Sequence, residues 1–546
     1  MENSLGMKLM GILSEPRKES IFMEVACMGL GIISTIFNEK DSDIDFVEKL
    51  NVLKLKYISV DKENLNRIIR LKKSNGINEL EFVVSFDNLN ETEAKSAAQC
   101  GLKLVNYNDV RKFDKQFSSK LLDIKATALI VFTSGTTSVN KPVRVSHESL
   151  MESLTGLANN PCKLTTDDIF LSASSLAIYP ERILIYLATI FGSSIAISKN
   201  FIEDSKLVHP TVFYISPRYL DFLYTQIQQD LSFESTMTQK IFQSTYMKKL
   251  KSFNKHKELK KNFLDSVAFN SVKEKFGGRV KLMFIGSGFV NVDILKFFRI
   301  VVGSEIIETY GSVETGEFTL CSGRDFVFGH VGGPLSSCEI KLSYLQDVTI
   351  EGIESSKYGE LCIRHTSEPL GYLDESIVDS EGWLHTGDIF KVNDEVFNFV
   401  YLERIEFVMK SKCGWAVLPQ KLEHFYRQSE FVAQILVYSD YRINGLIGII
   451  VPNQGYVMKN WAGRASDFKA LCKGPELIKF VGKNLRELAN RKALRPYELI
   501  REIILEPVPW TSHEFITSNL KIKRNVLIKK YENQIQEIVQ KVLISS

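Results

Sequence analysis

The stretch VFTSGTTSVNKPVRVSH, residues 131–147, joins an apolar run to a polar loop and a cation. The apolar run over 126–132 leads directly into four hydroxyl residues and one glycine, and Lys141 follows them. Ser146 is placed to N-cap a helix over 147–158. A strand, a polar loop and a helix in this order can hold phosphate, because loop N–H groups, hydroxyls and a lysine all favour anionic oxygens.

This loop alone does not identify a nucleotide site. The Walker A spacing GxxxxGK[ST] is absent from it. A surface turn rich in serine and threonine has the same composition. On this stretch alone, a phosphate loop and a surface turn therefore stand about equal.

The composition indicates a globular protein with more than one domain. A chain of 546 residues with 44% hydrophobic side chains can bury several cores, and disorder is not expected. The net charge of +3 gives no general reason to expect a nucleic acid partner. The eight cysteines form no CxxC pair and no Cys/His cluster along the sequence. We therefore predict neither a zinc site nor a disulfide scaffold. We expect the protein to reside in a reducing compartment.

A membrane-spanning segment is not predicted. The most apolar stretch, ILIYLATIFGSSIAI at 183–197, is shorter than the about 20 residues that a bilayer span needs, and it contains two serines. We interpret it as a buried helix and strand. The expected location is intracellular, either cytoplasmic or peripheral on the cytosolic face of an organelle membrane.

Hydrophobic patterning predicts an α/β fold. Short apolar runs alternate with helical patterns, which favours layered parallel sheets. These runs are ELEFVVSF, ATALIVF, DIFLSAS, SIAIS, PTVFYIS, VKLMFIG and EIIETYG. From about 329 to 403, short strands joined by glycine and proline turns predict a β-rich subdomain. Beyond it a compact α+β pattern begins, so we predict a large N-terminal domain over 1–403 and a small C-terminal domain over 404–546.

Two further stretches carry residue types that suit a nucleotide. ETYGSVETGE at 308–317 places Tyr310 and Glu314 after an apolar strand, where a tyrosine can stack on a purine and a carboxylate can hold Mg²⁺. EGWLHTGDIF at 381–390 offers Asp388 in what we expect to be a tight glycine turn, suited to ribose hydroxyls. A core tyrosine and a turn aspartate are the plainer interpretations.

The C-terminal stretch ITSNLKIKRNVL, residues 516–527, holds a basic cluster of Lys521, Lys523 and Arg524. A solvated basic tail is the plainer interpretation of this cluster. Four such stretches in one chain carry more information together than each does alone.

In their order and spacing, the four stretches resemble the motifs of the adenylate-forming (ANL) superfamily of AMP-binding enzymes. HPTVFYISPR, FGGRVKLMFIGSG and KSKCGWAVLPQKLEHFYRQSEFVAQILVYSD are similar to the eukaryotic-type long-chain fatty acyl-CoA synthetases, and the resemblance runs from about residue 20 to about 540. It implies an acid–thiol ligase that converts fatty acid, ATP and CoA to acyl-CoA, AMP and pyrophosphate through an acyl-adenylate. Mg²⁺ would accompany ATP, and CoA would be the co-substrate.

The resemblance also implies roles for individual residues. Lys521 would bridge the attacking carboxylate and the phosphate, Glu314 with Thr133 would hold Mg²⁺, and Arg404 would act at the hinge of a mobile C-terminal domain. Lys410 and Gly414 would line the CoA path. The implied ATP-binding residues are Thr133, Ser134, Gly135, Thr136, Thr137, Lys141, Gly286, Ser287, Gly288, Tyr310, Gly311, Asp388, Arg404 and Lys521.

Several positions depart from the family pattern. The loop reads Ser-Val-Asn-Lys-Pro at 138–142 where the family usually has Gly-x-Pro-Lys-Gly, and Val313 replaces a phosphate-binding threonine. At the hinge, Ile405 and Glu406 replace the usual lysines. An early family segment is expected to be missing before 25–37.

These departures keep two alternatives open. One is a non-catalytic relative that binds nucleotide or acyl chains, and the other is an acyl-AMP ligase with a different acceptor. The acyl chain length and the oligomeric state do not follow from the sequence.

Overall fold

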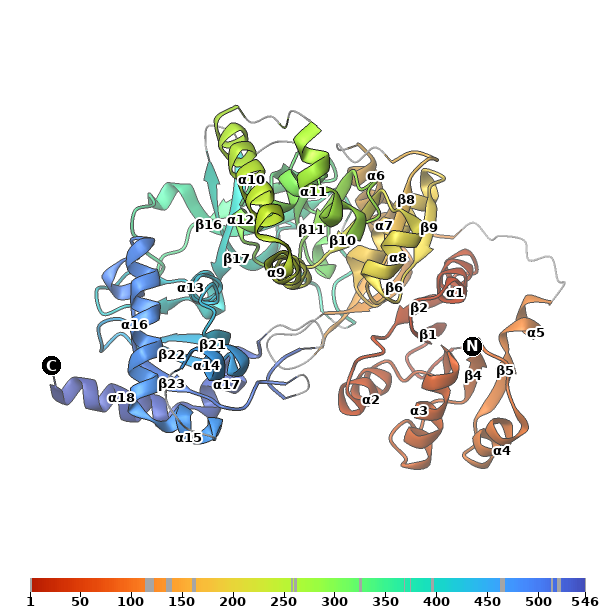
Figure 1. The fold of residues 1–546 in the computed structure, drawn as a ribbon. Coiled ribbons are helices and arrows are strands. Elements are labelled where there is room, and N and C mark those ends of the chain that lie inside the picture. Colours follow the sequence, from red (N-terminus) through yellow and green to blue (C-terminus); the bar gives the residue numbers. More distant parts are fainter. Residues whose placement is uncertain are drawn as a thin grey trace. The chain divides into compact units, whose positions relative to one another are not determined.

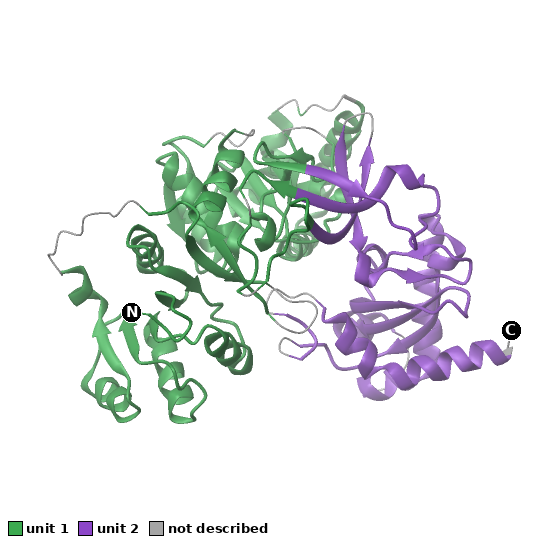
Figure 2. Cartoon of the chain, turned by 180° about the vertical axis from the view of Figure 1, so that it is seen from behind, with its two compact units in different colours: residues 1–133, 140–339, 364–384 green, residues 134–139, 340–363, 385–546 purple. Residues whose placement is uncertain are grey.

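The computed structural model describes residues 2–112, 122–133, 140–159, 164–256, 259, 263–323, 327–367, 369–373, 375–393, 397–461, 467–511, 514–517 and 522–545. The chain divides into two compact units (Figure 2). Unit 1 comprises 1–133, 140–339 and 364–384, and unit 2 comprises 134–139, 340–363 and 385–546. The domain boundary between 403 and 404 stays a prediction.

The first sheet of unit 1 has seven strands in the order β5-β4-β3-β1-β2-β6-β7 (Figure 1). Its strands are β1 (Leu9–Leu13), β2 (Ile33–Ile36), β3 (Tyr57–Val60), β4 (Phe82–Ser85), β5 (Lys103–Asn106), β6 (Thr127–Phe132) and β7 (Pro142–Ser146). The accompanying helices are α1 (Lys18–Gly29), α2 (Asp43–Val52), α3 (Lys62–Lys73), α4 (Glu91–Gln99) and α5 (Tyr107–Arg111). Every pair is parallel except β6 with β7. All five residues of β1 are buried, as expected for a strand inside a parallel sheet covered on both faces.

The second sheet of unit 1 has the order β14-β13-β12-β11-β10-β8-β9. Its strands are β8 (Ile169–Ser172), β9 (Ser194–Ile197), β10 (Val212–Ile215), β11 (Leu282–Ile285), β12 (Glu305–Tyr310), β13 (Leu320–Cys321) and β14 (Gly333–Pro334). The helices are α6 (His147–Asn159), α7 (Tyr179–Ile190), α8 (Phe201–Val208), α9 (Pro217–Phe233), α10 (Thr236–His256), α11 (Phe263–Lys275) and α12 (Val292–Val301). The strands from β9 to β12 in this order are parallel, so the predicted α/β fold with parallel sheets is confirmed.

The most apolar stretch of the chain forms α7 and β9, as predicted. Helix α7 is buried from Tyr179 to Ala188, whereas β9 is only partly buried. Among the described residues, no helix combines the length and the apolar character that a membrane span requires.

The β-rich region holds a four-stranded sheet in the order β15-β16-β17-β18. These strands are β15 (Cys338–Ser343), β16 (Tyr358–His365), β17 (Leu384–Asn393) and β18 (Asn398–Arg404). A two-stranded hairpin follows, made of β19 (Met409–Lys410) and β20 (Ala416–Val417). The predicted β-rich region is therefore present, and its four-stranded sheet ends at Arg404.

The rest of unit 2 is an α+β layer on a three-stranded sheet in the order β21-β22-β23. Its strands are β21 (Val432–Ser439), β22 (Leu446–Pro452) and β23 (Ile500–Leu505). Its helices are α13 (Pro419–Tyr426), α14 (Gln454–Asn460), α15 (Phe468–Lys473), α16 (Pro475–Arg491), α17 (Arg524–Lys530) and α18 (Glu532–Ser545). Strand β22 is buried throughout, and its pairing with β23 is parallel.

Candidate active site

The two described ends of the hydroxyl loop are joined by hydrogen bonds. The Thr133 N–H donates to the Lys141 carbonyl at 3.0 Å, and the Lys141 N–H donates to Thr133 Oγ1 at 3.1 Å. Of the predicted loop residues, Ser134, Gly135, Thr136 and Thr137 lie outside the described residues. These two bonds hold the residue that follows β6 beside the residue that precedes β7.

The expectation that this loop leads straight into a helix is wrong. Strand β7 intervenes and pairs antiparallel with β6, because PVRVS alternates apolar and polar side chains and packs Val143 and Val145 into the unit. Helix α6 begins only after β7. The predicted cap is confirmed, since the Ser149 N–H donates to Ser146 Oγ at 3.0 Å.

Tyr372 connects two of the predicted residues. The Lys141 ammonium lies 4.6 Å from the centroid of the Tyr372 ring, a cation–π distance. The Tyr372 hydroxyl donates to Glu314 Oε1 at 3.1 Å. We call Lys141, Tyr372 and Glu314 the contact chain. Sequence reasoning missed Tyr372, whose only local signal is a tyrosine after a glycine in PLGYLDES.

Arg144 on β7 forms hydrogen bonds to the backbone around Tyr372. The Arg144 Nε donates to the Tyr372 carbonyl at 3.0 Å, and Nη2 donates to the Leu370 carbonyl at 2.6 Å. The Arg144 N–H donates to the carbonyl of Gly371, a residue at φ +74°. These bonds hold Tyr372 beside β7, the strand that Lys141 immediately precedes.

Glu314 projects from a short turn that its neighbours hold rigidly. The turn is the 3-10 helix η1 (Val313–Thr315), which follows β12. The Ser312 N–H donates to Thr315 Oγ1 at 2.8 Å. A Cβ on Gly311 would lie 1.6 Å from the Glu317 carbonyl oxygen, so the glycine is required there. Val313 packs at the edge of the main core of unit 1.

The predicted adenine-pocket residues come together at the ends of β11 and β12. These parallel neighbours pair Ile285 with Glu308, so the stretch 286–288 lies beside Tyr310 and Gly311. A Cβ on Gly286 would lie 2.3 Å from Thr309 Oγ1. Ligands of open α/β sheets bind at the carboxyl ends of the strands.

Ser287, one of the residues predicted to line the adenine pocket, has an unusual backbone conformation. Its φ is +67°, a region that non-glycine residues seldom adopt. The Ser287 and Tyr214 hydroxyls form a hydrogen bond of 2.9 Å. Backbone strain such as this positive φ is frequent at binding sites. The hydrogen bond to Tyr214 on the neighbouring strand β10 helps to hold Ser287 in this conformation.

In unit 2, Asp388 and Arg404 face each other across the β17–β18 pair. The Arg404 Nε donates to Asp388 Oδ1 at 3.1 Å. Burial alone would lower the pKa of the Arg404 guanidinium, but the carboxylates of Asp388 and Glu406 outweigh it and raise that pKa. The expectation of a tight turn around Asp388 is wrong, because β17 runs through it. Gly387, at φ +69°, bends the strand without ending it.

Glu403 supports this pair, and sequence reasoning missed it as well. The side chain is fully buried, and burial raises the pKa of its carboxyl to about 8. Its two oxygens accept the N–H groups of Arg404 at 3.0 Å and Gln420 at 2.7 Å. Glu403 thus fixes the backbone of Arg404 against helix α13.

Two of the remaining predicted residues of unit 2 lie on the β19–β20 hairpin. Lys410 ends β19, and Gly414 turns the hairpin at φ +85°; both are exposed. Lys521 lies outside the described residues. Arg524 is not part of a solvated tail, because it is buried and its Nη2 donates to Glu423 Oε1 at 2.6 Å.

A model of the AMP-binding enzyme family matches residues 7–373 of this sequence. The chain belongs to this family. It is 26% identical to long-chain-fatty-acid–CoA ligase 5 of Mus musculus, over 98% of this chain and 80% of the relative. It is 27% identical to fatty acyl-CoA synthetase B of Dictyostelium discoideum, over 97% of this chain and 82% of the relative.

Solved structures agree with the fold. The A domain of carboxylic acid reductase from Segniliparus rugosus, in complex with AMP and a co-purified carboxylic acid, superposes with a TM-score of 0.74 at 18% identity. The match covers 98% of this chain and 83% of that chain. The resemblance to adenylate-forming enzymes that the motifs predicted is confirmed.

Proposed function

We propose that this AMP-binding enzyme is a long-chain fatty acid–CoA ligase that works through an acyl-adenylate. The observation that carries the proposal is the contact chain, which begins at Lys141 where the hydroxyl loop ends. The four motifs of this sequence also occur in the order that the family has. A cation, an aromatic ring and a carboxylate meet there within hydrogen-bond and cation–π distances. The curated relatives named above, both acyl-CoA ligases or synthetases, support the acceptor CoA.

In the first half-reaction, a fatty acid carboxylate would attack the α-phosphorus of ATP. Negative charge grows on phosphate oxygens in that step, so positioned cations and N–H donors stabilise it. Lys141 would take the β- and γ-phosphates beside the loop hydroxyls, and Lys521 would bridge the carboxylate and the α-phosphate. Tyr310 would stack on the base, and Asp388 and Arg404 would bind ribose and phosphate.

The residues assigned to Mg²⁺ have suitable chemistry. Glu314 offers a carboxylate and Thr133 a hydroxyl, and Mg²⁺ prefers such oxygen ligands together with substrate phosphates. Glu314 Oε1 accepts the Tyr372 hydroxyl, which orients the carboxylate before any ligand is present. When bound with ATP, the ion would offset charge on the phosphates.

In the second half-reaction, CoA thiolate would displace AMP from the acyl-adenylate. Lys410 and Gly414 lie on one exposed hairpin, where a long flexible substrate can approach without displacing a buried side chain. We assign this hairpin to the pantetheine path.

The test is pyrophosphate release from ATP with palmitate, measured with and without CoA. We expect release that depends on palmitate, and palmitoyl-CoA only when CoA is present. Acyl-adenylate that accumulates and transfers to no added CoA would indicate another acceptor. Tight ATP binding without any pyrophosphate release would contradict the ligase.

One observation favours the non-catalytic alternative. Val313 packs at the core edge where the family has a phosphate-binding threonine, and it cannot donate a hydrogen bond. A hydrogen bond to a charged group contributes about 1.5–3 kcal/mol, so its loss would slow adenylation roughly ten- to hundredfold. We therefore expect Val313→Thr, combined with Ser138→Gly, to speed ATP–pyrophosphate exchange without changing transfer from supplied acyl-AMP. If neither wild type nor this variant exchanges, the non-catalytic alternative is correct.

A further inference from the structure

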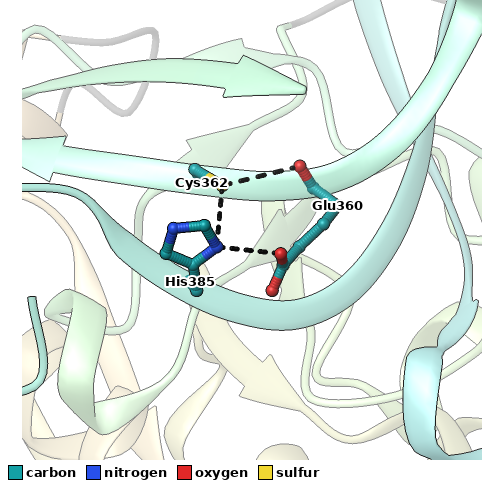
Figure 3. Close-up of side chains that lie close together, drawn as sticks. All are labelled: Glu360, Cys362 and His385. Atoms are coloured by element: carbon teal, nitrogen blue, oxygen red, sulfur yellow. Dashed lines mark hydrogen bonds and ion pairs between the residues drawn. The ribbon is translucent and has the colours of Figure 1, made fainter. Parts of the chain in front are cut away.

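Three side chains with metal-binding atoms meet on the four-stranded sheet of unit 2. Glu360 and Cys362 are two residues apart on β16 and so lie on one face, and His385 stands near the start of β17 (Figure 3). The His385 Nδ1 lies 2.9 Å from Glu360 Oε2 and 3.5 Å from Cys362 Sγ. One ligand atom of each residue lies within 4.8 Å of the other two.

We propose that Glu360, Cys362 and His385 bind a divalent transition metal of the zinc class. Tetrahedral zinc with sulfur, nitrogen and oxygen ligands separates those ligand atoms by roughly 3.4–3.6 Å, given bond lengths of about 2.0–2.3 Å. The sulfur–nitrogen distance of 3.5 Å already matches this geometry. The nitrogen–oxygen distance of 2.9 Å must widen by about half an ångström, which a small rotation of the glutamate allows.

The arrangement does not suit a nucleophilic cysteine. In a Cys–His–carboxylate triad the imidazole uses one ring nitrogen for the thiol and the other for the carboxylate. Here both partners converge on the same nitrogen, Nδ1. Cys362 is also fully buried, so a substrate cannot reach its sulfur. Three side chains whose ligand atoms lie within 4.8 Å of one another instead suit a shared cation.

The surroundings orient Glu360 and join the two strands that carry the ligands. The Gly387 N–H donates to Glu360 Oε1 at 3.0 Å, which leaves Oε2 directed at the imidazole. Thr386 Oγ1 donates to the Leu361 carbonyl at 2.8 Å and ties β17 to β16 between the ligands. Outer contacts of this kind hold metal ligands in place.

The solvent exposure of the three side chains differs, and it indicates where a fourth metal ligand can come from. The His385 side chain is 46% exposed, whereas that of Glu360 is 15% exposed. Solvent can therefore reach the open side of the cluster and supply a fourth ligand. The metal would tie β16 to β17 three residues before Asp388. This proposal replaces our expectation of no zinc site, which considered only spacing along the chain and so could not see His385 beside Cys362.

The test titrates the purified full-length chain with Zn²⁺ and Co²⁺, without ATP or fatty acid. We expect one ion per chain, and with Co²⁺ a thiolate-to-cobalt charge-transfer band. Cys362→Ser should abolish the band and raise the Kd for Zn²⁺ by more than about a hundredfold, because loss of a ligand costs more than loss of an outer contact. The matched control is Cys472→Ser, which removes another buried cysteine of unit 2 and should leave both readouts unchanged.

If Cys362→Ser does not fold, His385→Gln decides the question, since it should weaken Zn²⁺ binding while the protein stays folded. Wild-type protein that binds no Zn²⁺, or Cys362→Ser that binds it as tightly as wild type, overturns the proposal. The metal titration needs no catalysis, so its failure and failure of the ligase are separate results.

Discussion

In unit 1, two charged candidate residues are joined through one tyrosine, whereas the charged candidates of unit 2 lie in two separate places. In unit 1, Lys141 contacts Tyr372 and Tyr372 contacts Glu314. In unit 2, Asp388 is paired with Arg404 within one antiparallel pair of strands, and Lys410 stands on a different hairpin. The difference teaches that a substitution in unit 1 should disturb several functions together, while one in unit 2 should remove a single function.

The largest expected effect tests this separation in unit 2. Lys521→Ala should slow acyl-adenylate formation about a hundred- to thousandfold, because it removes a cation from the developing charge. Thioester formation from supplied acyl-AMP should stay within a few-fold of wild type. Both half-reactions are measured separately, with Lys523→Ala as the matched control, since that lysine is two residues away in the same basic cluster. A fall of both half-reactions together would show that unit 2 does not divide its roles.

The next effect concerns the pair on β17 and β18. Asp388→Asn keeps the shape and removes the charge that faces Arg404 and, in our proposal, the ribose. Loss of one charged hydrogen bond should raise the KM for ATP roughly ten- to hundredfold. The cost to folding should be only about 1 kcal/mol or less, since Arg404 is 37% exposed and solvent screens the pair. An unchanged KM would remove Asp388 from the nucleotide site.

A smaller effect probes whether the contact chain of unit 1 acts as one piece. Tyr372→Phe removes the bond to Glu314 and keeps the ring under Lys141, whereas Tyr372→Leu removes both. A cation–π contact near the surface contributes about 0.5–1 kcal/mol, so Tyr372→Leu should lower kcat/KM two- to fivefold more than Tyr372→Phe. In the Lys141→Ala background this difference should disappear. Strictly additive effects would show that the residues act independently.

Much of this site could be predicted because the signals are local. The parallel strands followed from short apolar runs, and the Ser146 cap followed from its position before a helix. The glycines 286 and 288 were assigned only through the resemblance to the family, and their role stays a prediction. Tyr372 and Arg144 escaped prediction because their partners lie 228 residues apart, and no spacing rule links them. Strand β7 was missed because its short alternating run, PVRVS, directly follows the polar loop and resembles a continuation of it.

A last prediction concerns stability and compares one histidine with a lowered pKa from each unit. Burial lowers the pKa of His365 in unit 1 and of His424 in unit 2 to about 4. Below the ordinary value of about 6.5, the unfolded chain binds protons that the folded chain does not, so stability falls as the pH drops from 6.5 toward 4. Between pH 7 and pH 5 each histidine should cost about 2 kcal/mol. The urea midpoint of unfolding is measured at pH 7 and at pH 5. The difference between the two midpoints should be smaller in His365→Gln and in His424→Gln than in wild type.

The hold of Arg144 on residues 370–372 also matters while the chain is being made. Strand β7 is an edge strand of its sheet, and its outer side is bridged by the antiparallel pairing of Val143 with Tyr372. Without that bridge, β7 would expose unpaired backbone N–H and C=O groups to other chains. In a nascent chain that has already formed β7, this edge would stay unpaired until residue 372 has left the ribosome. At 5–20 residues per second, synthesis of the roughly 230 intervening residues takes on the order of 10–50 seconds. During that interval the edge would be open to pairing with other chains, and we expect fragments that stop before residue 370 to aggregate.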